Sequence, residues 1–258
     1  MSNTTEAATN QFVADLQMPT LMRSTATAGK TPEQEDHKKS ASVAGNALLA
    51  FTANVSAQHK DDLLNSIGLA QLSAAVAKPK PFDASKDPMG YYGYVTNVLK
   101  QIGYTAQAID FSDYSFTTRT VEIDKIVLQV MASLLAAPEL AVVESALAAL
   151  KAAADSGGPT WKIYSSKSSS TNNGAFSIGL ANETNNSVAV QLSAFHFQAS
   201  EHSTQFLWSS YSATHIKLKD GRSTLVLNDS VYSGVRATVL ARMSGHAQGY
   251  IDNLPPLG

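Results

Sequence analysis

Apolar residues change their spacing near the middle of this 258-residue chain. Up to Asp155 they recur every three or four positions within Ala-rich segments, which is the period of a helix that buries one face. From Trp161 onward they alternate with Ser, Thr and Asn, which is the period of a strand with one buried side. Gly157, Gly158 and Pro159 separate the two patterns, and residues of these types interrupt regular structure. The pattern therefore predicts a helical part followed by a β part.

The first helical signals lie in the leading third of the chain. Residues 12–21 can form one short amphipathic helix, and a charged, polar connector follows it. Residues 43–77 carry helical spacing over a longer distance, with a break near 58–60. Asp61 is positioned to cap the part that follows the break, because Asp side chains accept hydrogen bonds from the free N–H groups of a first turn.

A second helix start is marked by Asp87 and Pro88. Asp is a good N-cap, and Pro suits the first helical position because it has no N–H group to leave unpaired. We expect this helix to end at Gly103. The aromatic residues within 109–120 then favour an extended crossing or an isolated strand.

The most apolar stretch of the chain is residues 123–154, interpreted as a helical hairpin or as one helix that is kinked at Pro138. Lys125, Glu139, Glu144 and Lys151 interrupt it, so it does not qualify as a permanent membrane span. The stretch is either the central helix pair of a bundle or a hairpin that leaves the core to enter a membrane. The residues that define this candidate rearranging hairpin are Ile123, Val127, Leu134, Pro138, Leu140 and Leu147.

Strand signals dominate after the change of period. Residues 182–187 are rich in Asn and predict a turn between two alternating segments, and Asp220 with Gly221 predicts a tight hairpin turn. The segments with strand-like alternation are residues 161–164, 176–180, 188–197, 216–227 and 231–243.

These patterns together predict an α+β protein of two domains. Residues 1–42 are expected to form a flexible or partly helical N-terminal arm, and residues 43–155 a mainly α-helical bundle. Residues 160–258 are expected to form an antiparallel β-sandwich, with a closed sheet as the alternative.

Composition narrows the classes of partner. The net charge is −2 and the pI is about 6.3, which gives no electrostatic reason to expect nucleic-acid binding. The chain has no cysteine, so disulfides, thiolate nucleophiles and Cys-based metal sites are excluded. The first thirty residues lack the pattern of a general secretory signal peptide. The localisation is therefore open between the cytoplasm and export by a signal-independent route.

No sequence motif dictates a chemistry. A Gly-rich phosphate loop, a zinc-protease helix and a Gly-x-Ser-x-Gly elbow are all absent. The spacings of His196, His202, His215 and His246 match no metal-binding signature. We therefore expect a protein that is not an enzyme and that binds neither a cofactor nor a metal.

Two groups of aromatic residues are candidates for contact with a surface or ligand. Tyr and Trp combine an apolar ring with a polar edge, so exposed clusters can bind sugars, lipid headgroups or proteins, whereas buried ones are simply core. The candidates are Trp208, Tyr211 and Tyr232 in the β part, and Tyr91 and Tyr92 in the helical part.

An Ala-rich helical part joined to a Ser/Thr/Asn-rich β part is similar in layout to bacterial membrane-active toxins. The resemblance implies that the β part binds a lipid membrane or a cell-surface ligand, and that hairpin 123–154 rearranges to form a pore. The alternative is a self-assembling structural subunit of a phage, a secretion apparatus or a filament, with an N-terminal arm that orders on a neighbour. Both interpretations predict a homo-oligomer.

Overall fold

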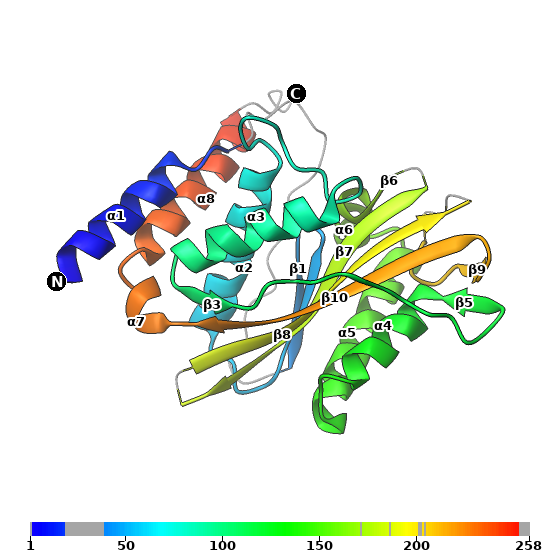
Figure 1. Cartoon of the computed structure of the whole chain (residues 1–258). Coiled ribbons are helices and arrows are strands. Elements are labelled where there is room, and N and C mark those ends of the chain that lie inside the picture. Colours follow the sequence, from blue (N-terminus) through cyan, green and yellow to red (C-terminus); the bar gives the residue numbers. More distant parts are fainter. Residues whose placement is uncertain are drawn as a thin grey trace, which may run out of the picture.

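The computed structural model describes residues 2–18, 39–170, 172–185, 187–200, 203 and 205–252. Within them, one twisted sheet lies between two layers of helices (Figure 1). The order of its main strands is β1-β2-β7-β8-β10-β3, with β4 paired to β10 and β6 to β7. These strands are β1 (Ser40–Ala44), β2 (Ala47–Phe51), β3 (Tyr104–Ala106), β4 (Ser112–Asp113), β6 (Ser169–Ser170), β7 (Asn173–Thr184), β8 (Ser187–Ala199) and β10 (Ile216–Leu227).

A parallel pair of strands joins the two parts of the chain. Strand β2 pairs with β7 in parallel, with Leu48 opposite Ile178, whereas the other strand pairs are antiparallel. Helices together with a mixed sheet confirm the α+β class. The expected β-sandwich is wrong, because β7, β8 and β10 belong to one sheet that also contains strands from the leading part. The expected two-domain layout is not confirmed.

Both faces of the central strands are apolar. Along β7, Phe176, Ile178 and Leu180 face one core, while Ala181 faces the other. Strand β8 alternates in the same way, with Val190 in the core that contains Ala181 and Phe195 in the core that contains Phe176. Successive side chains of a strand point to opposite faces, so a strand in the middle layer must be apolar on both.

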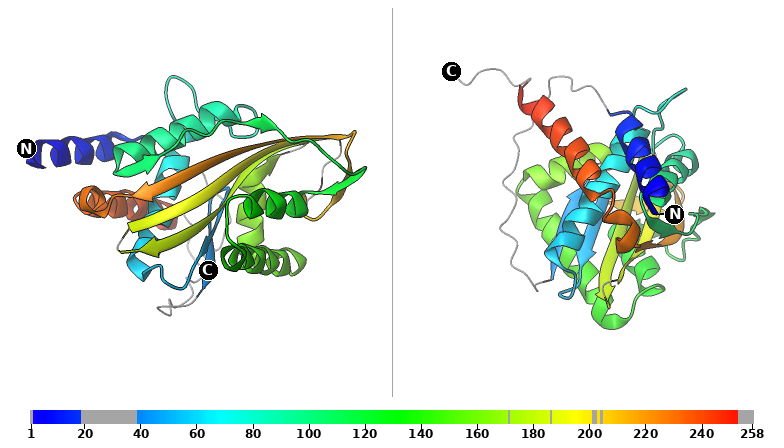
Figure 2. Two further views of the ribbon diagram at one scale, coloured as in Figure 1. Left: turned by 60° about the horizontal axis from the view of Figure 1, so that its bottom comes forward. Right: turned by 90° about the vertical axis from the view of Figure 1, so that its left-hand side faces the viewer.

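The helices form the two outer layers, as the views in Figure 2 show from the side. One layer consists of α1 (Ser2–Asp15), α2 (Ala57–Ala74), α3 (Pro88–Gln101), α7 (Asp229–Tyr232) and α8 (Arg236–Asp252). The other consists of α4 (Ile123–Ala132), α5 (Ala137–Asp155) and α6 (Pro159–Ser168). A small separate sheet, β5 (Thr120–Glu122) with β9 (Ser210–Ser212), lies beside the start of α4.

Several predicted elements are confirmed. Helix α3 begins at Pro88, and the Asp87 carboxylate accepts a hydrogen bond of 2.9 Å from the N–H of Gly90. Residues 123–155 form the predicted hairpin. The turn predicted at 182–187 connects β7 to β8, with Asn185 in the left-handed region at φ 51°. Within the expected N-terminal arm, residues 2–15 are helical, and residues 19–38 lie outside the described part of the chain.

Other predictions are wrong for identifiable reasons. Residues 40–51 form strands β1 and β2, and the helix after them is capped by Ser56 instead of Asp61. Residues 161–164 are helical, since Trp161 and Tyr164 are buried on one face at a spacing of three.

The predicted strand at 231–243 and the predicted turn at Asp220 and Gly221 are also wrong. Residues 231–232 end α7 and residues 236–243 lie in α8, with a turn between them, because Val235, Val239 and Met243 recur at the helical spacing of four. Strand β10 runs straight through Asp220 and Gly221. A Cβ at Gly221 would lie 2.5 Å from Cγ2 of Ile109, so this glycine allows a crossing segment to approach.

Candidate functional site

The α4–α5 hairpin covers one face of the sheet. Both helices are amphipathic, and α5 packs against β2, β7 and α6. The turn between them, residues 133–136, is short, and the N–H of Ala136 donates a 3.1 Å hydrogen bond to Oε2 of Glu139. The buried face of the hairpin is apolar and consists of Ile123, Ile126, Val127, Val130, Met131, Leu135, Val142, Val143, Ala146, Leu147, Leu150 and Ala154.

The residues expected to define the rearranging hairpin lie where a packed hairpin needs them. Ile123, Val127 and Leu147 are buried, and Leu134 and Leu140 are partly buried. Pro138 is exposed in the first turn of α5, where its missing N–H leaves no hydrogen bond unmade. None of the described helices is both long enough and apolar enough to cross a bilayer.

Polar contacts between this hairpin and the large sheet are few. Nδ2 of Asn182, on β7, donates a 3.0 Å hydrogen bond to Oε1 of Glu139. A second side-chain hydrogen bond, of 2.7 Å, is donated by the hydroxyl of Tyr114, directly after β4, to Oε1 of Gln129 on α4. Among the described residues, the Asn182–Glu139 bond is the one that joins the hairpin to a strand of the large sheet. The hairpin is therefore held to the sheet mainly by apolar burial.

The aromatic candidates do not form an exposed surface. Tyr91, Tyr92, Tyr211 and Tyr232 are all buried, and Tyr232 is fully so. Tyr91 and Tyr92 contact each other edge to face, with ring centroids 5.1 Å apart. The expectation of a surface contact at these four residues is wrong for this conformation, because apolar rings in a three-layer protein are mostly used as core.

Trp208 lies at the boundary of the core and is partly buried. Its ring centroid is 5.1 Å from that of Trp161, and Nζ of Lys151 lies 5.5 Å above its ring. Trp208 thereby connects α5 and α6 to the segment before β9. It is the one member of the aromatic group that is not classed with the buried core.

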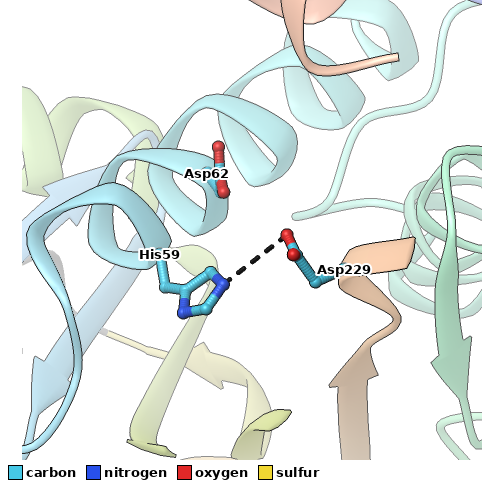
Figure 3. Close-up of side chains that lie close together, drawn as sticks. All are labelled: His59, Asp62 and Asp229. Carbon is cyan, nitrogen blue, oxygen red and sulfur yellow. Dashed lines mark ion pairs between the residues drawn. The ribbon is translucent and has the colours of Figure 1, made fainter. Parts of the chain in front are cut away.

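A charged cluster lies at the other side of the sheet, where α2, α7 and α8 meet (Figure 3). Nδ1 of His59 is 3.0 Å from Oε2 of Glu183, and its Nε2 is 3.6 Å from Oδ1 of Asp229. Arg236 donates from Nε to Oδ1 of Asp62 at 3.0 Å and from Nη2 to Oδ2 at 2.9 Å. Its Nη2 also donates to Oδ1 of Asp229 at 2.6 Å.

His59, Asp62 and Asp229 have the ligand types of a metal site, and their ligand atoms lie within 4.8 Å of one another. Arg236 already places a positive charge between the two carboxylates. The hydrogen bonds that Arg236 makes to Asp62 raise its pKa, so it stays charged. The cluster is therefore a salt-bridge network joining three helices, in which a guanidinium has the position that a cation would need.

Glu183 is ionised within this network. Burial by itself raises the pKa of its carboxyl group, but the hydrogen bond from the N–H of Ser56 and the contact with His59 outweigh burial and leave the pKa lowered. The Ser56 N–H lies 2.8 Å from Oε2 of Glu183. Glu183 thus ties the end of β7 to the first turn of α2.

A groove of about 990 Å³ lies beside the edge strand β1. Its walls come from the end of β1, one face of α2, residues 80–87 and the last turn of α6. The lining is mainly apolar and includes Val43, Leu64, Leu72, Phe82, Ile163 and Met243.

Sequence reasoning missed the charged cluster. The spacing within 43–77 predicts only a helix around Asp62, and the Asn-rich segment 182–187 predicts only a turn at Asn182 and Glu183. The cluster combines residues 59, 62, 183, 229 and 236, so no local motif could reveal it. Its one sequence signal is that Glu183 and Asp229 are acidic residues placed shortly after the strand-like segments 176–180 and 216–227.

No protein-family model matches the chain, and no curated protein matches it. Solved structures that align with it include one named delta-endotoxin, at a TM-score of 0.42 and 14% identity over 78% of this chain and 90% of that chain. The activated Cyt2Ba monomer of Bacillus thuringiensis subsp. israelensis aligns at a TM-score of 0.39 and 13% identity, over 72% of this chain and 98% of that chain. The Evf virulence factor aligns at a TM-score of 0.40 and 10% identity, over 90% and 88% of the two chains. With TM-scores below 0.5, these alignments assign the chain to no family.

Proposed function

We propose that this chain is a non-enzymatic membrane- or surface-binding protein whose α4–α5 hairpin separates from the sheet at a membrane. The observation that supports this proposal is the hairpin itself, an amphipathic pair held over an apolar sheet face with, among the described residues, one side-chain hydrogen bond to a strand of that sheet. An amphipathic helix lies well at a membrane interface, with its apolar face among the acyl chains.

If the hairpin separated from the sheet, the apolar side chains between them would have to contact water or lipid. Exposing a fully buried Val, Leu, Ile or Met side chain to water costs about 1.5–3 kcal/mol. The hairpin and the strands beneath it share many such side chains, so separation in water is strongly unfavourable. A bilayer offers the same side chains an apolar environment, which removes most of that cost. Membrane contact would therefore favour the open state, and membrane-bound copies with exposed apolar faces would associate into oligomers and pores.

Absence of catalysis is part of the proposal. Within the described ranges, both ring nitrogens of His59 face carboxylates, and no Ser, Thr or Lys side chain is hydrogen-bonded to that ring. A His–carboxylate pair whose ring is hydrogen-bonded to no hydroxyl or amine side chain lacks the nucleophile–base hydrogen bond of a covalent catalytic site.

Vesicle experiments with a fluorescent reporter test this function. The chain has no cysteine, so Ala146→Cys gives a single labelling site on the sheet-facing side of α5. With a fluorescent dye at this site, we expect quenching by lipids with spin-labelled acyl chains, and release of vesicle contents, when vesicles of mixed phosphatidylcholine and phosphatidylglycerol are added. A dye on the exposed Ala148 should be quenched less. No binding and no release with anionic, zwitterionic and sterol-containing vesicles would rule the proposal out.

Self-assembly is the second candidate function, and one observation favours it. Strand β1 is an edge of the sheet and, in the part of the chain that is described, pairs only with β2. An open edge can accept a strand from another copy. Light scattering and negative-stain imaging without lipid separate the two functions, since regular polymers in the absence of vesicles would support assembly.

A further inference from the structure

Two adjacent residues at the end of β7 contact opposite helical layers. Because side chains of a strand alternate between faces, Asn182 points to the layer that contains the α4–α5 hairpin, and Glu183 points to the layer that contains α2. Both side chains are polar, although the rest of β7 from Ala175 to Ala181 is buried.

On the hairpin side, Asn182 uses its whole amide group. Its Nδ2 donates to Oε1 of Glu139 at 3.0 Å, while its Oδ1 accepts from Nδ2 of Asn54 at 2.8 Å and from Oγ1 of Thr52 at 3.3 Å. The other carboxylate oxygen of Glu139 accepts the N–H of Ala136 at the turn of the hairpin. Asn182 thus joins the hairpin turn to the β2–α2 connection.

On the opposite side, Glu183 continues the chain of contacts. Its carboxylate accepts a hydrogen bond from the N–H of Ser56 and contacts the ring of His59. The ring of His59 also faces Asp229, which accepts a hydrogen bond from Arg236 at the start of α8. Contiguous polar contacts therefore extend from the hairpin turn through the end of β7 to the opposite helical layer.

We propose that Asn182 and Glu183 form a two-sided clasp that holds the α4–α5 hairpin against the sheet and sets how readily the hairpin separates. This inference rests on the proposed function and adds the contacts that control hairpin separation. Apolar contacts supply most of the binding of the hairpin, but they are not directional. The Asn182–Glu139 bond fixes the position of the turn, and the Glu183 contacts fix the strand end that carries Asn182.

Replacing the amide of Asn182 by a carboxylate tests the clasp. Asn182→Asp keeps the size of the side chain but places a second carboxylate opposite Glu139, where the two like charges repel each other. With Ala146→Cys as reporter, we expect the labelling rate of the thiol by a soluble disulfide reagent to rise about tenfold, as expected for local opening. With Ala70→Cys on the buried face of α2 as the control reporter, the rate should change little.

A second substitution should restore the closed state. In Asn182→Asp with Glu139→Gln, the amide of residue 139 can donate to the new carboxylate, so the hydrogen bond returns with its polarity reversed. Labelling at position 146 should return to within about threefold of the original rate. Glu144→Gln, which removes an exposed charge from the same helix, is the matched control and should have no effect.

The outcomes are distinct from those of the vesicle experiment, because labelling is measured without lipid. Unchanged labelling at 146 in Asn182→Asp, or an equal rise at positions 70 and 146, would overturn the clasp. If labelling changes as expected but vesicles are neither bound nor permeabilised, the clasp stands and the membrane function fails.

Discussion

Removing the buried carboxylate of Asp62 gives the sharpest test of the charged cluster. The side chain of Asp62 is 3% exposed and that of Arg236 is 20% exposed, and they are joined by three hydrogen bonds of 2.9, 3.0 and 3.1 Å. Breaking one partner of a buried pair costs about 3–5 kcal/mol, because the remaining charge loses its compensation. Arg236 keeps Asp229 and some contact with water, so we expect Asp62→Asn to lower the free energy of unfolding by about 2–3 kcal/mol.

Urea unfolding at pH 7, followed by circular dichroism, measures this loss. The matched control is Asp113→Asn, which removes an exposed pair with Lys219 whose side chains are 84% and 46% exposed. Exposed pairs contribute about 0–1 kcal/mol, so the control should remain near the original stability. Replacing both members, Asp62→Leu with Arg236→Met, should cost less than Asp62→Asn alone, since no buried charge is left unpaired. Equal small losses in Asp62→Asn and Asp113→Asn would refute the reasoning.

Four further substitutions each test a single feature of the fold. Gly103 has φ +109°, and a Cβ there would lie 3.1 Å from the backbone N of Tyr232, so Gly103→Ala should destabilise by about 1–3 kcal/mol in urea unfolding. Gly93→Ala in α3 meets no atom within 4 Å and should instead stabilise by about 0.5–1 kcal/mol; a loss there would contradict the argument. Tyr232→Phe removes the partner of Ser66 Oγ, a 3.0 Å hydrogen bond, and should cost about 1 kcal/mol or slightly more, while an unchanged melting temperature would count against it. The pKa of Glu183 is lowered from its ordinary value of 4.5, so its contribution to stability is present above that pH and is lost as the pH falls through the lowered pKa. The difference in unfolding free energy between the original chain and Glu183→Gln should therefore shrink in acid. A pH-independent difference would refute this.

The elements that the sequence predicts correctly have local signals. Asp87 with Pro88 marks the start of α3, and the apolar spacing of 123–154 gives the α4–α5 hairpin, because caps and periodicity act within a few residues. The helical spacing expected at residues 47–51 is wrong because β2, within the sheet, is apolar on both faces and has no alternation to distinguish it from a buried helix. The spacing of four from Val231 to Met243 fits both a helix and every second residue on one side of a strand, and only the tertiary fold decides between them.

The candidate site depends on contacts that sequence cannot report. His59 and Arg236 are far apart in the chain, and their common neighbours Asp62 and Asp229 lie near helix starts, where carboxylates are ordinary. The hairpin was predictable as a hairpin. Its attachment through Asn182 was not, because nothing local distinguishes this asparagine from its neighbours in an Asn-rich turn.

The parallel pairing of β2 with β7 has a consequence for folding. Leu48 and Ile178 are partners although 130 positions separate them, so the middle of the sheet closes only after a long loop of chain has been brought together. Such non-local pairing slows folding. It also means that a polypeptide cut at Gly157–Gly158 should yield two fragments that are each unstable alone, since each would carry an unpaired strand, but that recover the native spectrum when mixed.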